Sequence, residues 1–162
     1  MKIYNFGEQK SVMNRFIAEL RDKQIQKDSL RFRRNLERIG ELFAYEISKQ
    51  LKYEERDVQT PLGIAKCQLP AAKALVAPIL SAGLPLHQGV LNIFDSAQNA
   101  FIAAYRKYGK DNKFKIQMEY ATMPSIEGKT VVLVDPMLAT GGSAVAAIDF
   151  VTANAERCSV CS

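Results

Sequence analysis

The sequence contains no tryptophan, one histidine and three cysteines, and each of these low counts disfavours a class of protein. An odd number of cysteines cannot pair completely, so we expect a reducing compartment rather than a disulfide scaffold. A structural zinc site needs four ligands, and the single His87 lies far along the chain from Cys158 and Cys161, which disfavours a zinc or redox site at that pair. Nine glycines in 162 residues are too few for a fibrous protein.

Long apolar runs are also absent from the sequence. No run approaches the roughly 20 residues that span a bilayer, and residues 1–8 lack the apolar core and cleavage site of a signal peptide. We therefore expect a cytoplasmic protein without a membrane partner. With 48% hydrophobic and 24% charged residues, the length matches one globular domain, 1–162. The formal net charge of +5 indicates only that an anionic partner would be attracted.

Two helices are predicted in residues 1–52, which we interpret as a helical arm. Apolar residues recur at helical spacing within residues 8–23, and a second helix is predicted from about Asp28 to about Leu51, with Asp28 or Ser29 as its N-cap. The second helix begins with a basic cluster of four residues: Arg31, Arg33, Arg34 and Arg38. Such a cluster is more often a solvated helix face than a phosphate or nucleic-acid surface, and both interpretations stay open.

Residues 53–162 have the pattern of an α/β core. A hairpin is predicted within residues 58–67, turned at Pro61 and Gly63. Three apolar runs without clean alternation follow, as is typical of strands buried on both faces of a parallel sheet. These runs are Ala74–Leu80, Asn99–Tyr105 and Lys129–Asp135.

Helices are predicted between the first two runs, at residues 85–94, and again after Gly142. The order β-α-β…β-α indicates a doubly wound α/β domain. The polar stretch Lys107–Ser125 is long enough to be a lid or binding loop, although Phe114–Tyr120 could form a strand of its own. No buried run follows residue 150, so the last crossover is predicted to be unfinished and the last strand or strands to be missing.

One segment combines residues suited to binding a sugar phosphate. A buried strand delivers Asp135 to its carboxyl end, where ligands bind in open α/β sheets. A turn with Thr140, Gly141, Gly142 and Ser143 then leads into a helix, and its exposed N–H groups, its hydroxyls and the helix start all suit an anion. The spacing lets the carboxylate bind sugar hydroxyls while the turn holds a phosphate on the same sugar. A plain helix cap with a convenient glycine pair is the alternative.

Neither the Walker loop nor the Gly-x-Gly-x-x-Gly fingerprint is present. The string Asp135-Pro-Met-Leu-Ala-Thr-Gly-Gly-Ser143 instead resembles the signature with which uracil phosphoribosyltransferases bind phosphoribosyl pyrophosphate (PRPP). The resemblance extends in the family's order from about Leu30 to about Phe150. The other segments that carry it are Arg31-Phe32-Arg33, Gly40, Tyr45-Glu46, Ala77–Leu84, Gly89–Leu91 and Tyr105-Arg106.

The resemblance implies a type I phosphoribosyltransferase fold, Rossmann-like, with a parallel sheet flanked by helices. It implies the transfer of ribose 5-phosphate from PRPP to uracil in pyrimidine salvage, giving uridine monophosphate (UMP) and pyrophosphate. It further implies Mg²⁺ bound with PRPP and a homo-oligomer, either a dimer or a higher assembly.

By the same resemblance, Asp135 and Arg106 are the candidate catalytic residues. Asp135 would hold the ribose hydroxyls, residues 139–143 would cradle the 5′-phosphate, and Arg106 would meet the pyrophosphate. Residues 107–125 would close over PRPP and exclude water. The complete set of candidate PRPP contacts is Ser81, Arg106, Asp135, Pro136, Met137, Leu138, Ala139, Thr140, Gly141, Gly142 and Ser143.

Two departures from the family pattern bear on the binding of PRPP and uracil. At Ser81 the family usually has Arg, and serine has neither the charge nor the reach of a pyrophosphate clamp. The family's Pro-Gly-Leu-Gly-Asp-type segment, which selects uracil, does not occur. We therefore expect weak PRPP binding and little or no transfer to uracil.

Two other functions are compatible with the pattern. A regulatory protein with the PRPP fold could bind RNA or DNA through the basic cluster, although no nucleic-acid module is recognisable. A catalytically silent subunit could instead join intact subunits. His87 is interpreted as a structural residue, because no Ser or Cys motif with a third partner supports a catalytic triad.

Overall fold

The computed structural model describes the backbone of residues 3–71, 73–108, 114–153 and 157–161, and the side chains of all of these except 104–108, 114–120 and 157–161. Its helices are α1 (Met13–Arg21), α2 (Ser29–Ser48), α3 (Leu84–Ile93) and α4 (Gly142–Thr152), with short 3₁₀ turns at Phe6–Glu8 and Ile25–Lys27. None of the helices in the described ranges is long and apolar enough to cross a membrane.

A parallel sheet forms the centre of the fold, with strand order β4-β3-β7-β8 among the described residues. Its strands are β3 (Ala74–Pro78), β4 (Gln98–Asn99), β7 (Thr130–Val134) and β8 (Arg157–Cys161). Every residue of β3 and β7 is buried, because both strands have a neighbour on each side and packing on both faces. Of the three runs predicted as strands buried on both faces, the first and the third are confirmed.

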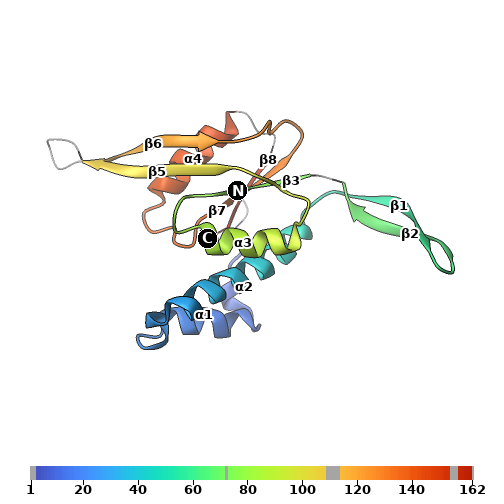
Figure 1. The fold of residues 1–162 in the computed structure, drawn as a ribbon, viewed down its shortest axis with the longest axis horizontal. Coiled ribbons are helices and arrows are strands. Elements are labelled where there is room, and N and C mark those ends of the chain that lie inside the picture. Colours follow the sequence, from blue (N-terminus) through green and yellow to red (C-terminus); the bar gives the residue numbers. More distant parts are fainter. Residues whose placement is uncertain (1–2, 72, 109–113, 154–156, 162) are drawn as a thin grey trace.

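Alternate residues of β3 and β7 face opposite layers of the fold (Figure 1). Val76, Val132 and Val134 pack in one cluster with α2 and α3, and α1 lies on the outer side of α2. Leu75 and Leu133 pack in a second cluster that includes residues of α4. The helical arm and α3 therefore cover one face of the sheet, and α4 covers the other.

The helical arm begins its long helix where the sequence predicts. The Asp28 carboxylate accepts hydrogen bonds from the backbone N–H groups of Leu30 and Arg31, both at 3.0 Å, so it caps α2. Helix α2 then packs closely on α3 because Gly40 and Gly89 face each other at the crossing. A Cβ atom on Gly89 would lie 2.7 Å from the carbonyl carbon of Glu37. Only glycine allows the two backbones to approach this closely.

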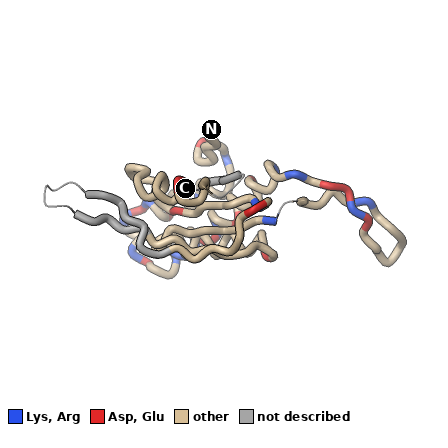
Figure 2. Tube along the Cα trace, turned by 90° about the horizontal axis from the view of Figure 1, so that it is seen from above, with Lys and Arg blue, Asp and Glu red and all other residues tan. Residues whose placement is uncertain are grey.

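Two hairpins extend from opposite ends of the molecule (Figure 1). Strands β1 (Tyr53–Thr60) and β2 (Gly63–Pro70) pair with each other in a separate antiparallel sheet. This confirms the predicted turn, and Figure 2 shows charged residues of both signs along the hairpin. Strands β5 (Phe101–Tyr108) and β6 (Phe114–Thr122) form the second hairpin. The strand alternative for residues 114–120 is thereby confirmed.

The second apolar run does not form one buried strand, and this prediction was wrong. Asn99 ends the short β4 beside β3, whereas Phe101 onwards pairs antiparallel with β6. Only the bridge between Ile79 and Ile102 keeps the start of β5 parallel to the sheet. The run continues past the end of β3, so its later residues have no central strand beside them.

The prediction that the last crossover is unfinished was also wrong. Strand β8 pairs parallel with β7 from Thr130↔Arg157 to Val134↔Cys161, so α4 connects two adjacent parallel strands. The sequence signal was missing because β8 lies at the sheet edge, and an edge strand needs no continuous apolar run.

Candidate functional site

The candidate site lies where β3 and β7 end at the same edge of the sheet. Pro78 and Val134 are paired in register, and the N–H of Ile79 donates to the carbonyl of Val134 at 2.9 Å. The turn at residues 79–83 therefore lies directly beside Asp135, which follows β7. Ligands of open α/β folds bind at this edge.

Asp135 is the acidic side chain that the sequence placed at this edge, and only 9% of it is exposed. Burial raises the pKa of the Asp135 carboxyl above its ordinary value, and a hydrogen bond from the backbone N–H of Met137 partly opposes that shift. The bond is long, at 3.5 Å. A carboxylate held in this way is poorly solvated and has capacity for further donors, such as sugar hydroxyls.

The turn after Asp135 has the backbone form of an anion cradle. Ala139 and Gly141 have positive φ angles of 45° and 76°, and the N–H of Gly141 donates to the carbonyl of Leu138 at 2.7 Å. Helix α4 begins at Gly142, and no side chain among the described residues caps its N-terminus. The first N–H groups of a helix have no intrahelical acceptor, so those of Gly142 and Ser143 remain available.

The alternative of a plain helix cap stays open, because glycine is itself a common N-cap residue and Gly141 occupies that position. The turn is open to an anion: Met137 is 74% exposed and Leu138 51%. Thr140 is exposed, whereas Pro136 and Ser143 are half-buried.

Ser81 lies at the same edge, in the turn that follows β3. Its side chain is exposed, and its carbonyl accepts from the N–H of Leu84 at 3.3 Å, where α3 begins. The peptide between Leu80 and Ser81 is cis. The structure thus brings together the two turns that the sequence assigned to PRPP.

Arg106 lies in β5 and pairs with Ile116 of β6, but its side chain is outside the described residues. Its contact with pyrophosphate therefore stays a prediction. The backbone of its strand passes the edge that carries the site, because Ala100 donates to Val76 at 3.0 Å and Leu80 donates to Ile102 at 2.8 Å. The β5–β6 hairpin therefore starts from the same edge of the sheet and extends beyond it (Figure 1).

His87 lies in the first turn of α3 and is only 6% exposed. Its ring packs against Phe101 with centroids 5.7 Å apart, and its Nε2 atom has no hydrogen-bond partner among the described residues. Burial lowers the pKa of the imidazole, and the Asn99 side chain opposes the shift. This packing favours the structural interpretation of His87.

Three of the four arginines in the basic cluster have partners within the helical arm. Arg31 pairs with Glu19 at 3.1 Å, and Arg34 pairs with Glu37. Arg38 donates to the side-chain oxygen of the fully buried Asn35 at 3.1 Å. A hydrogen bond from Asn35, followed by one from Arg31, holds the pKa of Glu19 below its ordinary value. These contacts favour the interpretation of the cluster as a structural helix face.

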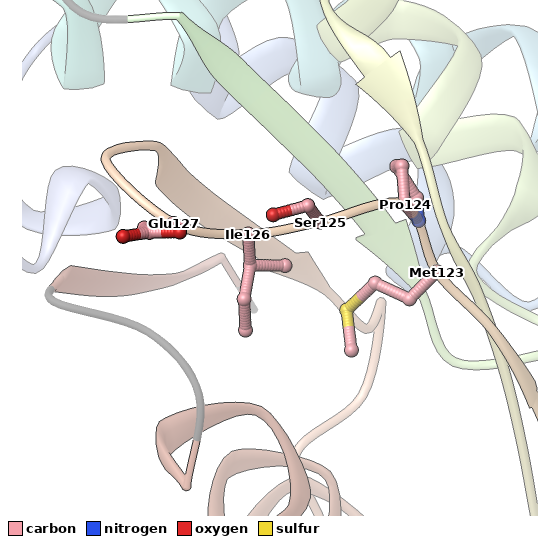
Figure 3. Close-up of a pocket in the computed structure, with 5 residues that line it drawn as sticks. All are labelled: Met123, Pro124, Ser125, Ile126 and Glu127. Atoms are coloured by element: carbon pink, nitrogen blue, oxygen red, sulfur yellow. The ribbon is translucent and has the colours of Figure 1, made fainter.

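An open depression of about 460 Å³ lies along the segment between β6 and β7. Its described lining is residues 123–127, and none of these is a candidate PRPP contact. Met123 and Ile126 point away from the sheet strand behind them and pack in the cluster shared with α4 (Figure 3). We interpret the segment as a cover for the sheet face.

Comparison with known proteins identifies the family. The sequence model described as uracil phosphoribosyltransferase matches residues 8–161, nearly the whole chain. The chain belongs to the uracil phosphoribosyltransferase family. Proteins of that name from Porphyromonas gingivalis and Dictyoglomus turgidum are 52% identical over 143 residues and 43% identical over 134 residues. The resemblance seen in the sequence is confirmed.

The alignments with these two relatives cover 88% and 82% of this chain, but 66% and 62% of the relatives. The chain therefore spans less than two thirds of their length.

Solved structures confirm the fold class. A protein of Aquifex aeolicus matches with a TM-score of 0.82 at 25% identity, covering 94% of this chain and 72% of that one. A purine phosphoribosyltransferase from Pyrococcus horikoshii matches with a TM-score of 0.58 at 14% identity, covering 77% of this chain and 70% of its own. The uracil phosphoribosyltransferase family member described here thus has the α/β fold expected from the resemblance, a parallel sheet flanked by helices.

Sequence reasoning missed one residue at the candidate site. Gly83 ends the turn after β3 and lies against the carbonyl of Val134. Its lack of a side chain allows this turn to touch the one that follows β7. The available signals were its place in the segment Ala77–Leu84, which carries the family resemblance, and its position directly before the helix start at Leu84-Pro85.

Proposed function

We propose that the turn Asp135–Ser143 binds PRPP and that the protein serves the transfer of ribose 5-phosphate from PRPP to uracil. The observation that carries the proposal is the N-terminus of α4, which no described side chain caps, seven residues after a buried carboxylate at the same sheet edge. The 5′-phosphate is bound by the N–H groups of Gly142 and Ser143 and by the Thr140 hydroxyl. Asp135 accepts the ribose hydroxyls, which suits a poorly solvated carboxylate.

The chemistry requires little covalent participation by the protein. The bond between C1′ of ribose and pyrophosphate breaks, with its electron pair leaving on pyrophosphate. N1 of uracil bonds to C1′, and its proton passes to the released pyrophosphate or to solvent. A cation beside pyrophosphate stabilises the negative charge that develops on the leaving group, and the Asp135 carboxylate stabilises the positive charge that develops on the ribose. We assign Arg106 to the pyrophosphate, from a strand that passes this edge.

We propose that Mg²⁺ enters with PRPP. Within the described residues, no three His, Cys, Asp or Glu side chains converge on a possible metal site. Mg²⁺ commonly binds through one or two carboxylates and the phosphates of a substrate, and Asp135 is the carboxylate at this edge. The residues present fit an ion held largely by PRPP, which would neutralise the departing pyrophosphate.

We propose that the β5–β6 hairpin shields the bound PRPP from water. It begins beside β3 at Ile102 and extends past the edge that carries Asp135, with α4 packed on its base. This arrangement replaces the single loop expected over residues 107–125 with a paired hairpin. Excluding water protects PRPP from hydrolysis.

The test of the proposed function has two parts: calorimetric titration with PRPP and Mg²⁺, and release of pyrophosphate from PRPP and Mg²⁺ with and without uracil, alongside UMP formation. Saturable, Asp135-dependent PRPP binding supports the proposal, and its absence contradicts it. The expectation of weak binding and little transfer stays a prediction that the same assay decides, since a normal rate of UMP formation would contradict it.

We also propose a homo-oligomer. The β1–β2 hairpin exposes the apolar side chains Tyr53, Leu62, Ile64 and Leu69, and an isolated hairpin is marginally stable in water. Burial of this hairpin against a second copy would stabilise both. Light scattering on the purified protein tests this. The silent-subunit and cytoplasmic predictions stay open, whereas the internal pairing of the basic cluster disfavours the nucleic-acid alternative.

A further inference from the structure

Gly83 lies at the point where the two turns of the candidate site touch. Its φ of −69° and ψ of −14° are ordinary helical values that any residue adopts. Conformational freedom therefore does not explain a glycine here. The reason is space: a Cβ atom would lie 2.8 Å from the carbonyl oxygen of Ile79 and 2.9 Å from that of Val134.

Both of these oxygens belong to backbone that is already fixed. The Ile79 carbonyl accepts from the N–H of Gly83 at 3.1 Å, and the Val134 carbonyl accepts from the N–H of Ile79 at 2.9 Å. A side chain can rotate away from a new methyl group, but a carbonyl bonded in this way can move only with its chain. Pro78 closes a third side, with its Cβ 3.1 Å from the same position.

We propose that Gly83 is a positioning residue that fixes the distance between Asp135 and the Ser81 turn, so that one PRPP molecule can reach both. Val134 directly precedes Asp135, and Ser81 lies two residues before Gly83. Any group that separates Gly83 from Val134 therefore separates the ribose-binding carboxylate from the pyrophosphate side of the site. This inference rests on the proposed function, because it concerns the placement of PRPP.

The expected effect of Gly83→Ala follows from the contact distance. Ordinary contact begins near 3.4 Å, so a methyl group at 2.9 Å has to displace the Val134 carbonyl by about 0.5 Å. Misplacement of a binding group by a fraction of an ångström to one ångström costs on the order of 10- to 100-fold. We expect the Kd for PRPP to rise by about tenfold or more.

The first test compares Gly83→Ala with Val90→Ala, by melting temperature and by calorimetric titration with PRPP in the presence of Mg²⁺. Val90 is fully buried in the middle of α3, seven residues after Gly83 and beside Gly40 of α2, so its truncation lowers stability without adding an atom between the two turns. Val90→Ala is expected to melt earlier and to keep the wild-type Kd. Gly83→Ala is expected to bind more weakly than a loss of stability explains. An unchanged Kd in folded Gly83→Ala overturns the proposal.

A second measurement needs no variant to fold. Wild-type protein labelled with ¹⁵N at glycine is titrated with PRPP and Mg²⁺, and the amide signals are followed by nuclear magnetic resonance. The signal of Gly83 is expected to shift with those of Gly141 and Gly142, whereas those of Gly40 and Gly89 stay unchanged. A stationary Gly83 signal while Gly141 and Gly142 shift overturns the positioning role alone. If no glycine signal responds, the proposed function fails, and the positioning role with it.

Discussion

The crossing of α2 and α3 gives a sharp stability prediction at Gly89. In Gly89→Ala, the added Cβ would overlap the carbonyl oxygen of Glu37, and it would lie 2.7 Å from the carbonyl carbon of Glu37 and 3.0 Å from the backbone nitrogen of Glu41. All three atoms belong to the backbone of α2, so no side-chain rotation relieves the contact. Ordinary contact at 3.4 Å requires the helices to separate by at least about 0.7 Å, the difference between 3.4 and 2.7 Å for the carbonyl carbon, and by more for the closer oxygen.

That separation would loosen a fully packed interface. Leu86, Val90 and Ala44 are almost completely buried there, and a gap of 0.5–1 Å removes roughly a quarter to a half of the attraction between packed atoms. Overpacking of this kind costs about 1–3 kcal/mol of unfolding free energy. At roughly 2–4 °C per kcal/mol for a domain of this size, the expected fall in Tm is up to about 12 °C.

Thermal unfolding followed by circular dichroism measures this loss. Gly7→Ala is the matched control, because its Cβ would meet only the side-chain oxygen of Asn5, at 3.3 Å. We expect the control to stay within about 0.5 kcal/mol of wild type. If Gly89→Ala melts with the control, the helices do not approach as closely as described, and the explanation for this glycine is wrong.

Three further predictions concern the edge that carries the site. Burial raises the folded-state pKa of the Asp135 carboxyl, so its contribution to stability is most favourable below the ordinary carboxyl value of 3.8 and declines as pH rises through the folded pKa. Asp135→Asn should therefore melt at or above the wild-type temperature at neutral pH. A lower Tm would contradict this. Burial lowers the folded-state pKa of the His87 imidazole, so protonation of the unfolded chain should reduce stability as pH falls below about 6.5. Between about pH 7.5 and about pH 5.5, the Tm of His87→Gln should fall less than that of the wild type. An equal fall in both proteins would count against the burial of His87. Because Ser81 is exposed, the side chain of Ser81→Arg has room for a charge-assisted contact of about 1.5–3 kcal/mol with pyrophosphate. Calorimetry should then show PRPP binding that is roughly 10- to 150-fold tighter than in the wild type. No gain in affinity would show that this turn does not face pyrophosphate.

The sequence predicts the centre of this fold well and its margins poorly. The runs that became β3 and β7 were recognisable because a strand covered on both faces must be apolar throughout. Strand β8 and the course of β5 were misjudged, since edge and hairpin strands lack that constraint. The site turn was recognisable because Asp135 and the glycines are close in sequence.

Other features of the site depend on contacts that a single sequence does not display. The role of Gly83 between the two turns depends on the carbonyl of Val134, which lies 51 residues further along the chain. The pairing of Arg31 with Glu19 and the burial of Asn35 likewise require the packing of α1 on α2. Composition alone left the basic cluster available for a nucleic acid, and only the folded arm shows its internal partners.

The central claim is that Asp135 and the start of α4 bind PRPP. Calorimetric titration of the wild-type protein and of Asp135→Asn with PRPP and Mg²⁺ tests it most directly. The account predicts saturable binding to the wild type and binding roughly 10- to 150-fold weaker in the variant, as expected for the loss of charge-assisted hydrogen bonds. Equal affinity in the two proteins, or no binding to the wild type, would contradict it.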